Sequence, residues 1–74
     1  MPRLPTISSR KFCKFLEGRE FIPIRQSGSH RFYKHKDGRT MVVPIHTKKD
    51  IGRGLLRPIL RDANISPEEF VRSL

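Results

Sequence analysis

The stretch HRFYKHKDGRTMVVPI, residues 30–45, predicts a β-hairpin and decides the fold class. Asp37-Gly38 is a strong signal for a two-residue hairpin turn, because such turns need positive φ angles. Residues 30–36 would form the first strand and residues 39–45 the second. The second strand alternates as a half-buried strand does, with Met41, Val43 and Ile45 set against Thr40 and Val42.

A further strand is expected immediately before this hairpin, over residues 21–27. The segment is mostly apolar but contains Pro23, which cannot donate a ladder hydrogen bond. A proline within a strand therefore favours a position at the edge of a sheet. The three strands would therefore form one antiparallel sheet with residues 21–27 at its edge.

Helical spacing precedes the strands, since Phe12, Phe15 and Leu16 fall on one apolar stripe. Ser8 or Thr6 is predicted to cap the start of this helix, and Gly18 to end it in a left-handed turn. The residues before it, with Pro2 and Pro5, are expected to form an extended lead-in.

The final third of the chain is also helical in pattern. We place the start of its first helix near Gly54, so that Pro58 falls in the first turn, where a missing N–H costs little. Asn64 can adopt the left-handed conformation that stops a helix. Ser66-Pro67-Glu68-Glu69 is a capping box, which predicts a short helix through Leu74.

These elements give an α+β fold in the order α-β-β-β-α, with a short extra C-terminal helix. The order resembles a double-stranded-RNA-binding domain, which implies a three-stranded antiparallel sheet with helices on one face. A chain of 74 residues can hold only a small core, so we expect a single domain over residues 1–74. Any chemistry would then sit on an open face or in a shallow groove.

The charge indicates an anionic partner. Lys and Arg total 16 against 7 Asp and Glu, a formal net charge of +9. Such an excess is typical of nucleic-acid binding or of attraction to anionic membrane. No apolar run approaches the length of a spanning helix, and the first residues lack a secretory pattern, so nucleic acid is favoured over membrane.

The cysteine count and the histidine spacing favour neither a disulfide nor a metal site. Cys13 is alone, which fits a reducing, cytoplasmic location, and it is expected to be a small packed or half-exposed side chain. Its spacing from the three histidines shows none of the close pairs of structural zinc ligands. We expect neither a metal nor another cofactor.

The segment Gln26-Ser27-Gly28-Ser29-His30 is the strongest candidate for chemistry. Gly28 and the serines predict a tight turn, and His30 opens the next strand, where its backbone would be fixed. Imidazole exchanges protons near neutral pH. Ser29 or Gln26 could orient the ring or hold a phosphate oxygen, although a lone surface histidine without a function is the commoner case.

RNA suits such a histidine better than DNA does. The 2′-hydroxyl of RNA is a built-in nucleophile, so an enzyme needs only proton transfer and charge neutralisation at the phosphate. DNA would require a metal ion or a separate nucleophile, and the sequence has no acidic metal-binding cluster. If the chain cuts nucleic acid, RNA is the favoured substrate.

Other side chains are weaker candidates. His46 could be a partner acid or base, a phosphate contact or an ordinary loop residue, and His35 is interpreted as solvated charge. Phe32 and Tyr33 must point to opposite faces of their strand, so one is core and the other can stack on a base. The predicted RNA-binding side chains are Arg10 and Lys11 in the first helical turn, Arg25, Arg31, Tyr33, and Lys48 and Lys49 in the loop that begins at Thr47.

Motifs along nearly the whole chain resemble the HicA family of mRNA interferase toxins. They run in the family's order: Arg25-Gln26-Ser27-Gly28-Ser29-His30, Pro44-Ile45-His46, Gly52-Arg53-Gly54-Leu55-Leu56, Ile59-Leu60-Arg61, Asn64-Ile65-Ser66 and Glu69-Phe70. The sequence departs from the family at Gly54, where many members have threonine, and at Pro58, which interrupts a stretch that in the family is often more favourable to a helix.

The resemblance implies the toxin of a type II toxin-antitoxin system, a metal-independent endoribonuclease whose catalytic histidine corresponds to His30. It also implies RNA as substrate and a HicB-type antitoxin as partner. The alternatives are a non-catalytic RNA-binding module of the same fold and a protein whose basic face exists for an acidic partner.

Overall fold

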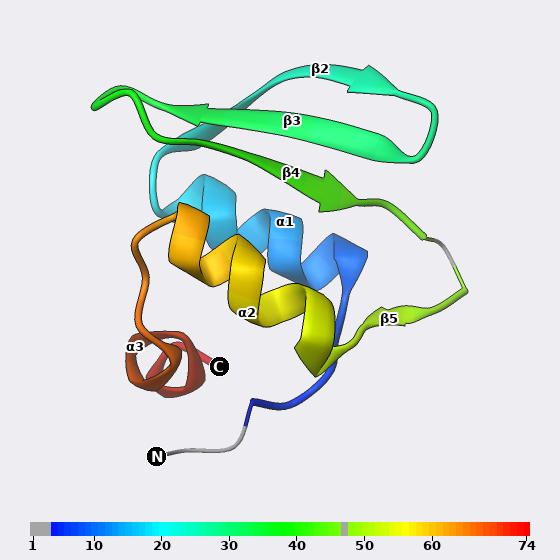
Figure 1. Cartoon of the computed structure of the whole chain (residues 1–74), viewed down its shortest axis with the longest axis vertical. Coiled ribbons are helices and arrows are strands. Elements are labelled where there is room, and N and C mark those ends of the chain that lie inside the picture. Colours follow the sequence, from blue (N-terminus) through cyan, green and yellow to red (C-terminus); the bar gives the residue numbers. More distant parts are fainter. Residues whose placement is uncertain (1–3, 47) are drawn as a thin grey trace.

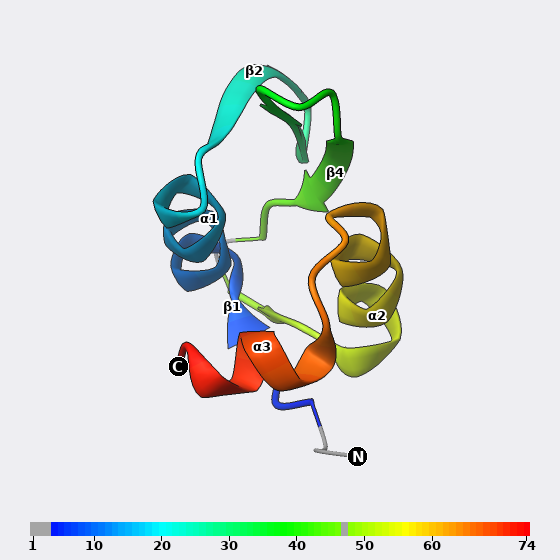
Figure 2. The ribbon, with the colours of Figure 1, turned by 90° about the vertical axis from the view of Figure 1, so that its left-hand side faces the viewer.

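The computed structural model describes residues 4–46 and 48–74, which form three helices and five strands. The predicted residues Pro2 and Thr47 lie outside the described part. One layer is a three-stranded antiparallel sheet with the order β2 (Phe21–Ser27), β3 (His30–His35) and β4 (Thr40–Pro44). Helices α1 (Ser9–Gly18) and α2 (Arg53–Asp62) lie beneath it (Figures 1 and 2). The predicted α+β fold, with helices on one face of the sheet, is confirmed.

Helix α1 (Ser9–Gly18) begins where Ser8 caps it, its hydroxyl accepting the Lys11 N–H at 3.2 Å. Phe12 and Leu16 are fully buried, as is Cys13 apart from a few per cent of its surface. The prediction that Gly18 ends the helix in a left-handed turn is wrong. Gly18 stays helical, and the left-handed residue is Glu20, with φ of 68°.

Strand β2 (Phe21–Ser27) has the predicted bounds and lies at the edge of the sheet, where Pro23 costs no ladder bond. Its register with β3 shifts between Pro23 and Arg25, so that Ile24 forms a bulge. Gly28 and Ser29 close the β2–β3 turn, and Gly28 supplies the positive φ of 59° that the first central position of this turn requires.

Strands β3 (His30–His35) and β4 (Thr40–Pro44) form the predicted hairpin. Its loop is one residue longer than expected. The His35 N–H donates to the Arg39 carbonyl at 2.8 Å, which leaves Lys36, Asp37 and Gly38 as a three-residue loop. Gly38 has φ of 102°, as the last residue of such a loop requires.

Helix α2 (Arg53–Asp62) differs from the prediction in the position of Pro58. The helix starts at Arg53, so Pro58 lies in its second turn and removes the N–H that would reach the Gly54 carbonyl. The end of the helix is as predicted: Asn64 is left-handed with φ of 58°. The Ile65 N–H then donates to the Leu60 carbonyl, and both side chains are buried, which completes a Schellman motif.

Helix α3 (Pro67–Arg72) closes the side of the core away from the sheet (Figure 2). Ser66 caps it as predicted, although the helix ends two residues before Leu74. Glu69 forms an ion pair with Arg19, the residue that follows α1, and Phe70 packs edge-on against Phe15 with ring centroids 5.1 Å apart.

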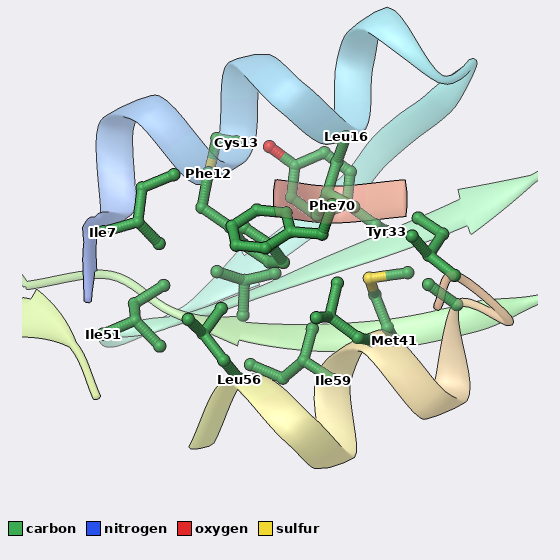
Figure 3. Packing of buried hydrophobic residues seen from close by; sticks show 14 of the residues in the cluster. Ile7, Phe12, Cys13, Leu16, Tyr33, Met41, Ile51, Leu56, Ile59 and Phe70 are labelled. Carbon is green, nitrogen blue, oxygen red and sulfur yellow. The ribbon is translucent and has the colours of Figure 1, made fainter. Parts of the chain in front are cut away.

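A second, two-stranded antiparallel ladder joins β1 (Ile7–Ser8) and β5 (Asp50–Ile51). The sequence did not predict this pair. Ile7 and Ile51 are cross-strand partners in it, and both are buried in the core that Figure 3 shows. The ladder holds the segment after β4 against the start of α1.

Candidate active site and nucleic-acid interface

The outer face of the sheet, opposite the helices, carries the predicted catalytic histidine. Side chains along β3 alternate, so His30, Phe32 and Lys34 point outward. Tyr33 and His35 point toward the helices and are buried. His30 and Phe32 therefore share one exposed surface, as the sequence pattern required.

His30 is exposed, but its backbone is held on both sides. It pairs with Ser27 of β2 and with Pro44 of β4. The adjoining turn is fixed as well, because the Ile45 N–H donates to the Ser29 carbonyl at 2.6 Å. An imidazole in this position combines access to solvent with a rigid attachment, which suits proton transfer to a bound substrate.

Gln26 supports the same turn but lies on the other face of the sheet from His30. Its Nε2 donates to the Gly28 carbonyl at 3.1 Å, and its Oε1 accepts from Arg31 Nε at 3.0 Å. Gln26 and Arg31 are cross-strand partners, and theirs is the pair next to that of Ser27 and His30. The structure thus places Gln26 as a brace for the turn and for Arg31.

Phe32 is the aromatic residue of the outer face. Its ring is partly buried, and the Arg25 guanidinium lies over it at 4.2 Å from the centroid. A ring and a guanidinium stacked in this way offer two flat surfaces on which nucleotide bases stack.

The predicted RNA contact by Tyr33 is wrong, because its side chain is fully buried. Tyr33 lies under α1 between the sheet and Leu16 (Figure 3), and its hydroxyl donates to Glu17 Oε2 at 2.7 Å. Burial raises the pKa of this hydroxyl above its ordinary value.

The interpretation of His35 as solvated charge is also wrong. Only 8% of its surface is exposed, and its ring packs edge-on against Phe21 at 5.0 Å. Its Nδ1 accepts the Asp37 N–H at 3.1 Å, so the imidazole is part of the hairpin's structure.

A groove that we call the histidine groove runs between strand β4 and helix α2. Both His30 and His46 line it. Most of its other lining is apolar and includes Phe32, Val42, Pro44, Leu55 and Pro58. The two exposed imidazoles thus open into one shallow, largely apolar surface.

A second groove, the basic groove, lies between the first turns of α1 and the segment before β5. It has a volume of about 660 Å³. Of the predicted RNA-binding residues, it brings together Arg10, Arg31, Lys48 and Lys49. Lys11 is exposed on α1 outside its lining, and Arg25 belongs to the outer face of the sheet instead.

Lys14 also lines the basic groove and was missed by the sequence analysis. Its signal is helical spacing, since Arg10 and Lys14 are four residues apart and share a face of α1.

His46 lines both grooves, and Ser9 fixes its position. Ser9 is 3% exposed and is the first residue of α1. Its hydroxyl accepts the His46 N–H at 3.0 Å and lies 3.3 Å from the His46 carbonyl, to which it can donate. The exposed imidazole of His46 is therefore carried by a backbone tied to the helix.

Among the described residues, 4–46 and 48–74, no group of three or more His, Cys, Asp or Glu side chains is placed to hold a metal ion. Within the same ranges, no helix has the length and apolar character needed to cross a membrane. The imidazoles of His30 and His46 and the cations of the basic groove are the groups to which we assign chemistry.

Residues 9–65 match the model of a protein family described as the HicA toxin of bacterial toxin-antitoxin systems. The match includes His30 and His46, the whole three-stranded sheet and helices α1 and α2. A comparison with curated proteins finds no match.

Proposed function

Because this chain belongs to the HicA toxin family and is thus a toxin of a bacterial toxin-antitoxin system, we propose that it is an endoribonuclease that cleaves mRNA without a metal ion. His30 is the general acid or base of this reaction, and His46 is its partner. The observation that carries the proposal is that these two exposed imidazoles line one groove.

Two imidazoles can share the proton transfers that RNA cleavage needs. One takes the proton of the 2′-hydroxyl as its oxygen bonds to the phosphorus, and the other protonates the departing 5′ oxygen. The products are a cyclic phosphodiester on one fragment and a free 5′-hydroxyl on the other. Neighbouring cations offset the charge that develops on the phosphate.

The partner of the toxin in this proposal is a HicB-type antitoxin that covers the histidine groove. The sheet has exposed apolar side chains at Ile22, Ile24 and Val42, and helix α2 has one at Leu55, which lines the histidine groove; these would suit such a contact. A bound antitoxin would exclude RNA from His30.

The test is cleavage of a long mRNA by the purified, partner-free protein in the presence of EDTA. The wild type should cut, and His30→Ala and His46→Ala should each lower the rate by about a hundredfold or more while RNA binding is retained. Lys36→Ala is the control, since Lys36 is exposed in the hairpin loop. Among the described residues, its one salt bridge is to Glu20, and neither residue lines either groove.

Absence of cutting by well-folded wild type would favour the other function considered, a non-catalytic RNA-binding module. Undiminished cutting by both histidine variants would contradict the assigned roles while leaving a ribonuclease. Folding of each variant is checked by circular dichroism.

A further inference from the structure

The basic groove and the histidine groove meet at His46 but differ in chemistry. Five cations line the basic groove, from α1, β3 and the segment before β5: Arg10, Lys14, Arg31, Lys48 and Lys49. Among the described residues that line the histidine groove, Asp62 is the only one with a carboxylate, and none is a lysine or an arginine. The two surfaces are therefore suited to different parts of a ligand.

Two carboxylates also line the basic groove, and each already accepts a hydrogen bond. Glu17 accepts from the Tyr33 hydroxyl, and Asp50 lies 3.4 Å from the Thr6 hydroxyl. In the described part of the chain, no salt bridge involves any of the five cations. Their charge is thus available to a ligand.

The walls of the basic groove are held in place without a ligand. Ser9 ties the backbone of His46 to α1, and Ser8 pairs with Asp50 across the β1–β5 ladder. Gln26 holds the guanidinium of Arg31 at its Nε. The backbone of His46, the β1–β5 ladder and the Arg31 guanidinium therefore need little reordering when the groove binds an anion.

We propose that the basic groove is the binding site for the phosphodiester backbone that flanks the scissile bond, so that one RNA strand crosses past His46 from this groove into the histidine groove. The location of the scissile bond rests on the proposed ribonuclease function. The backbone site itself does not, because a strand that cannot be cleaved would bind there too.

The first measurement is the affinity of the full chain for a single-stranded DNA oligonucleotide, which has the phosphates but no 2′-hydroxyl, at several salt concentrations. Lys48→Ala/Lys49→Ala should weaken binding about tenfold or more and lower the salt slope by about 1.4, since each phosphate contact on a single strand contributes about 0.7. Lys14→Ala should act in the same direction with a smaller change.

The matched control is Lys36→Ala/Arg72→Ala, which removes the same net charge from exposed residues outside the groove. It should leave the salt slope unchanged. Equal losses in the control and in the Lys48/Lys49 variant would overturn the proposal, because binding would then depend on net charge alone.

A cleavage assay separates this proposal from the proposed function. With RNA as substrate, the Lys48/Lys49 variant should have a raised KM and a nearly unchanged kcat, whereas His30→Ala loses kcat. If the wild type binds DNA through the groove but cuts no RNA, the ribonuclease proposal fails and the backbone site stands. If RNA is cut and the groove variants keep the wild-type affinity and KM, the backbone site fails.

Discussion

The Ser9 hydroxyl lies against both polar backbone groups of His46, 3.0 Å from its nitrogen and 3.3 Å from its carbonyl oxygen. The two residues are 37 positions apart in the chain. One buried hydroxyl thereby connects the start of α1 to the residue at which the two grooves meet.

Replacing Ser9 by Ala should reduce both stability and activity. Removal of the hydroxyl leaves an N–H and a carbonyl of His46 without a partner in a partly buried position, which should cost about 1–2 kcal/mol of unfolding free energy. Urea denaturation measures this cost. Ser27→Ala, which removes an exposed hydroxyl on β2, is the control and should change it by less than about 0.5 kcal/mol.

If Ser9 positions His46, the cleavage rate of Ser9→Ala should be lower than that of the wild type even under conditions where the variant is fully folded. Unchanged kcat and KM in the folded variant would show that the hydroxyl serves stability alone.

Phe32 should contribute to RNA binding in place of Tyr33. Phe32→Leu removes the flat ring on the outer face and should weaken binding of single-stranded RNA by about tenfold, since base stacking contributes about 1–3 kcal/mol. Phe32→Tyr keeps the ring and should bind as wild type does. Equal affinity for all three proteins, measured by fluorescence anisotropy, would contradict the stacking role.

Ionisation of Tyr33 should lower the unfolding free energy at alkaline pH. Burial raises the pKa of its hydroxyl in the folded state above the unfolded value of about 10. The corresponding contribution to stability is fully present below pH of about 10 and is lost as the pH rises through the folded-state pKa. Tyr33→Phe should therefore show a weaker alkaline decline.

The titration of Tyr33 can be followed directly, because the chain has one tyrosine and no tryptophan. Tyrosinate absorbance should appear above the pH at which a free tyrosine ionises, or together with unfolding. An ordinary tyrosine titration in the folded protein would contradict the burial of this hydroxyl.

Pro58→Ala should make the protein more stable. The substitution restores an N–H that can donate to the Gly54 carbonyl, and Pro58 is exposed, so little packing is lost. We expect a gain of about 1 kcal/mol or more in unfolding free energy. Arg57→Ala, at the preceding exposed position, should change it by less than about 0.5 kcal/mol. A destabilised Pro58→Ala would mean that the rigidity of proline in the unfolded chain outweighs the missing bond.

Much of this fold is predictable from local chemistry. The helix ends are examples: Ser8 and Ser66 cap helices as predicted, and Asn64 adopts the predicted left-handed conformation. Such caps depend only on neighbours a few residues away in the chain. The alternation of Met41 and Val43 likewise gives the correct buried face of β4.

What the sequence missed depends on contacts between distant segments. Phe32 and Tyr33 had to face opposite ways, but the packing of α1 under the sheet decides that Tyr33 is the buried one. Strands β1 and β5 contain two residues each, too few for any periodicity. Lys14 joins Lys48 and Lys49 in one groove through the same long-range pairing.

Helix α3 has a consequence for what counts as the minimal folding unit. The family match ends at Ile65, yet Phe70 is fully buried and packs edge-on against Phe12 and Phe15, with ring centroids 5.8 and 5.1 Å away. A chain shortened to the matched residues would present that aromatic cluster to water and lose the Arg19–Glu69 ion pair. In a domain this small, such a loss is comparable to its whole stability. The residues that identify the family are thus fewer than the residues that an autonomous, soluble fragment must contain.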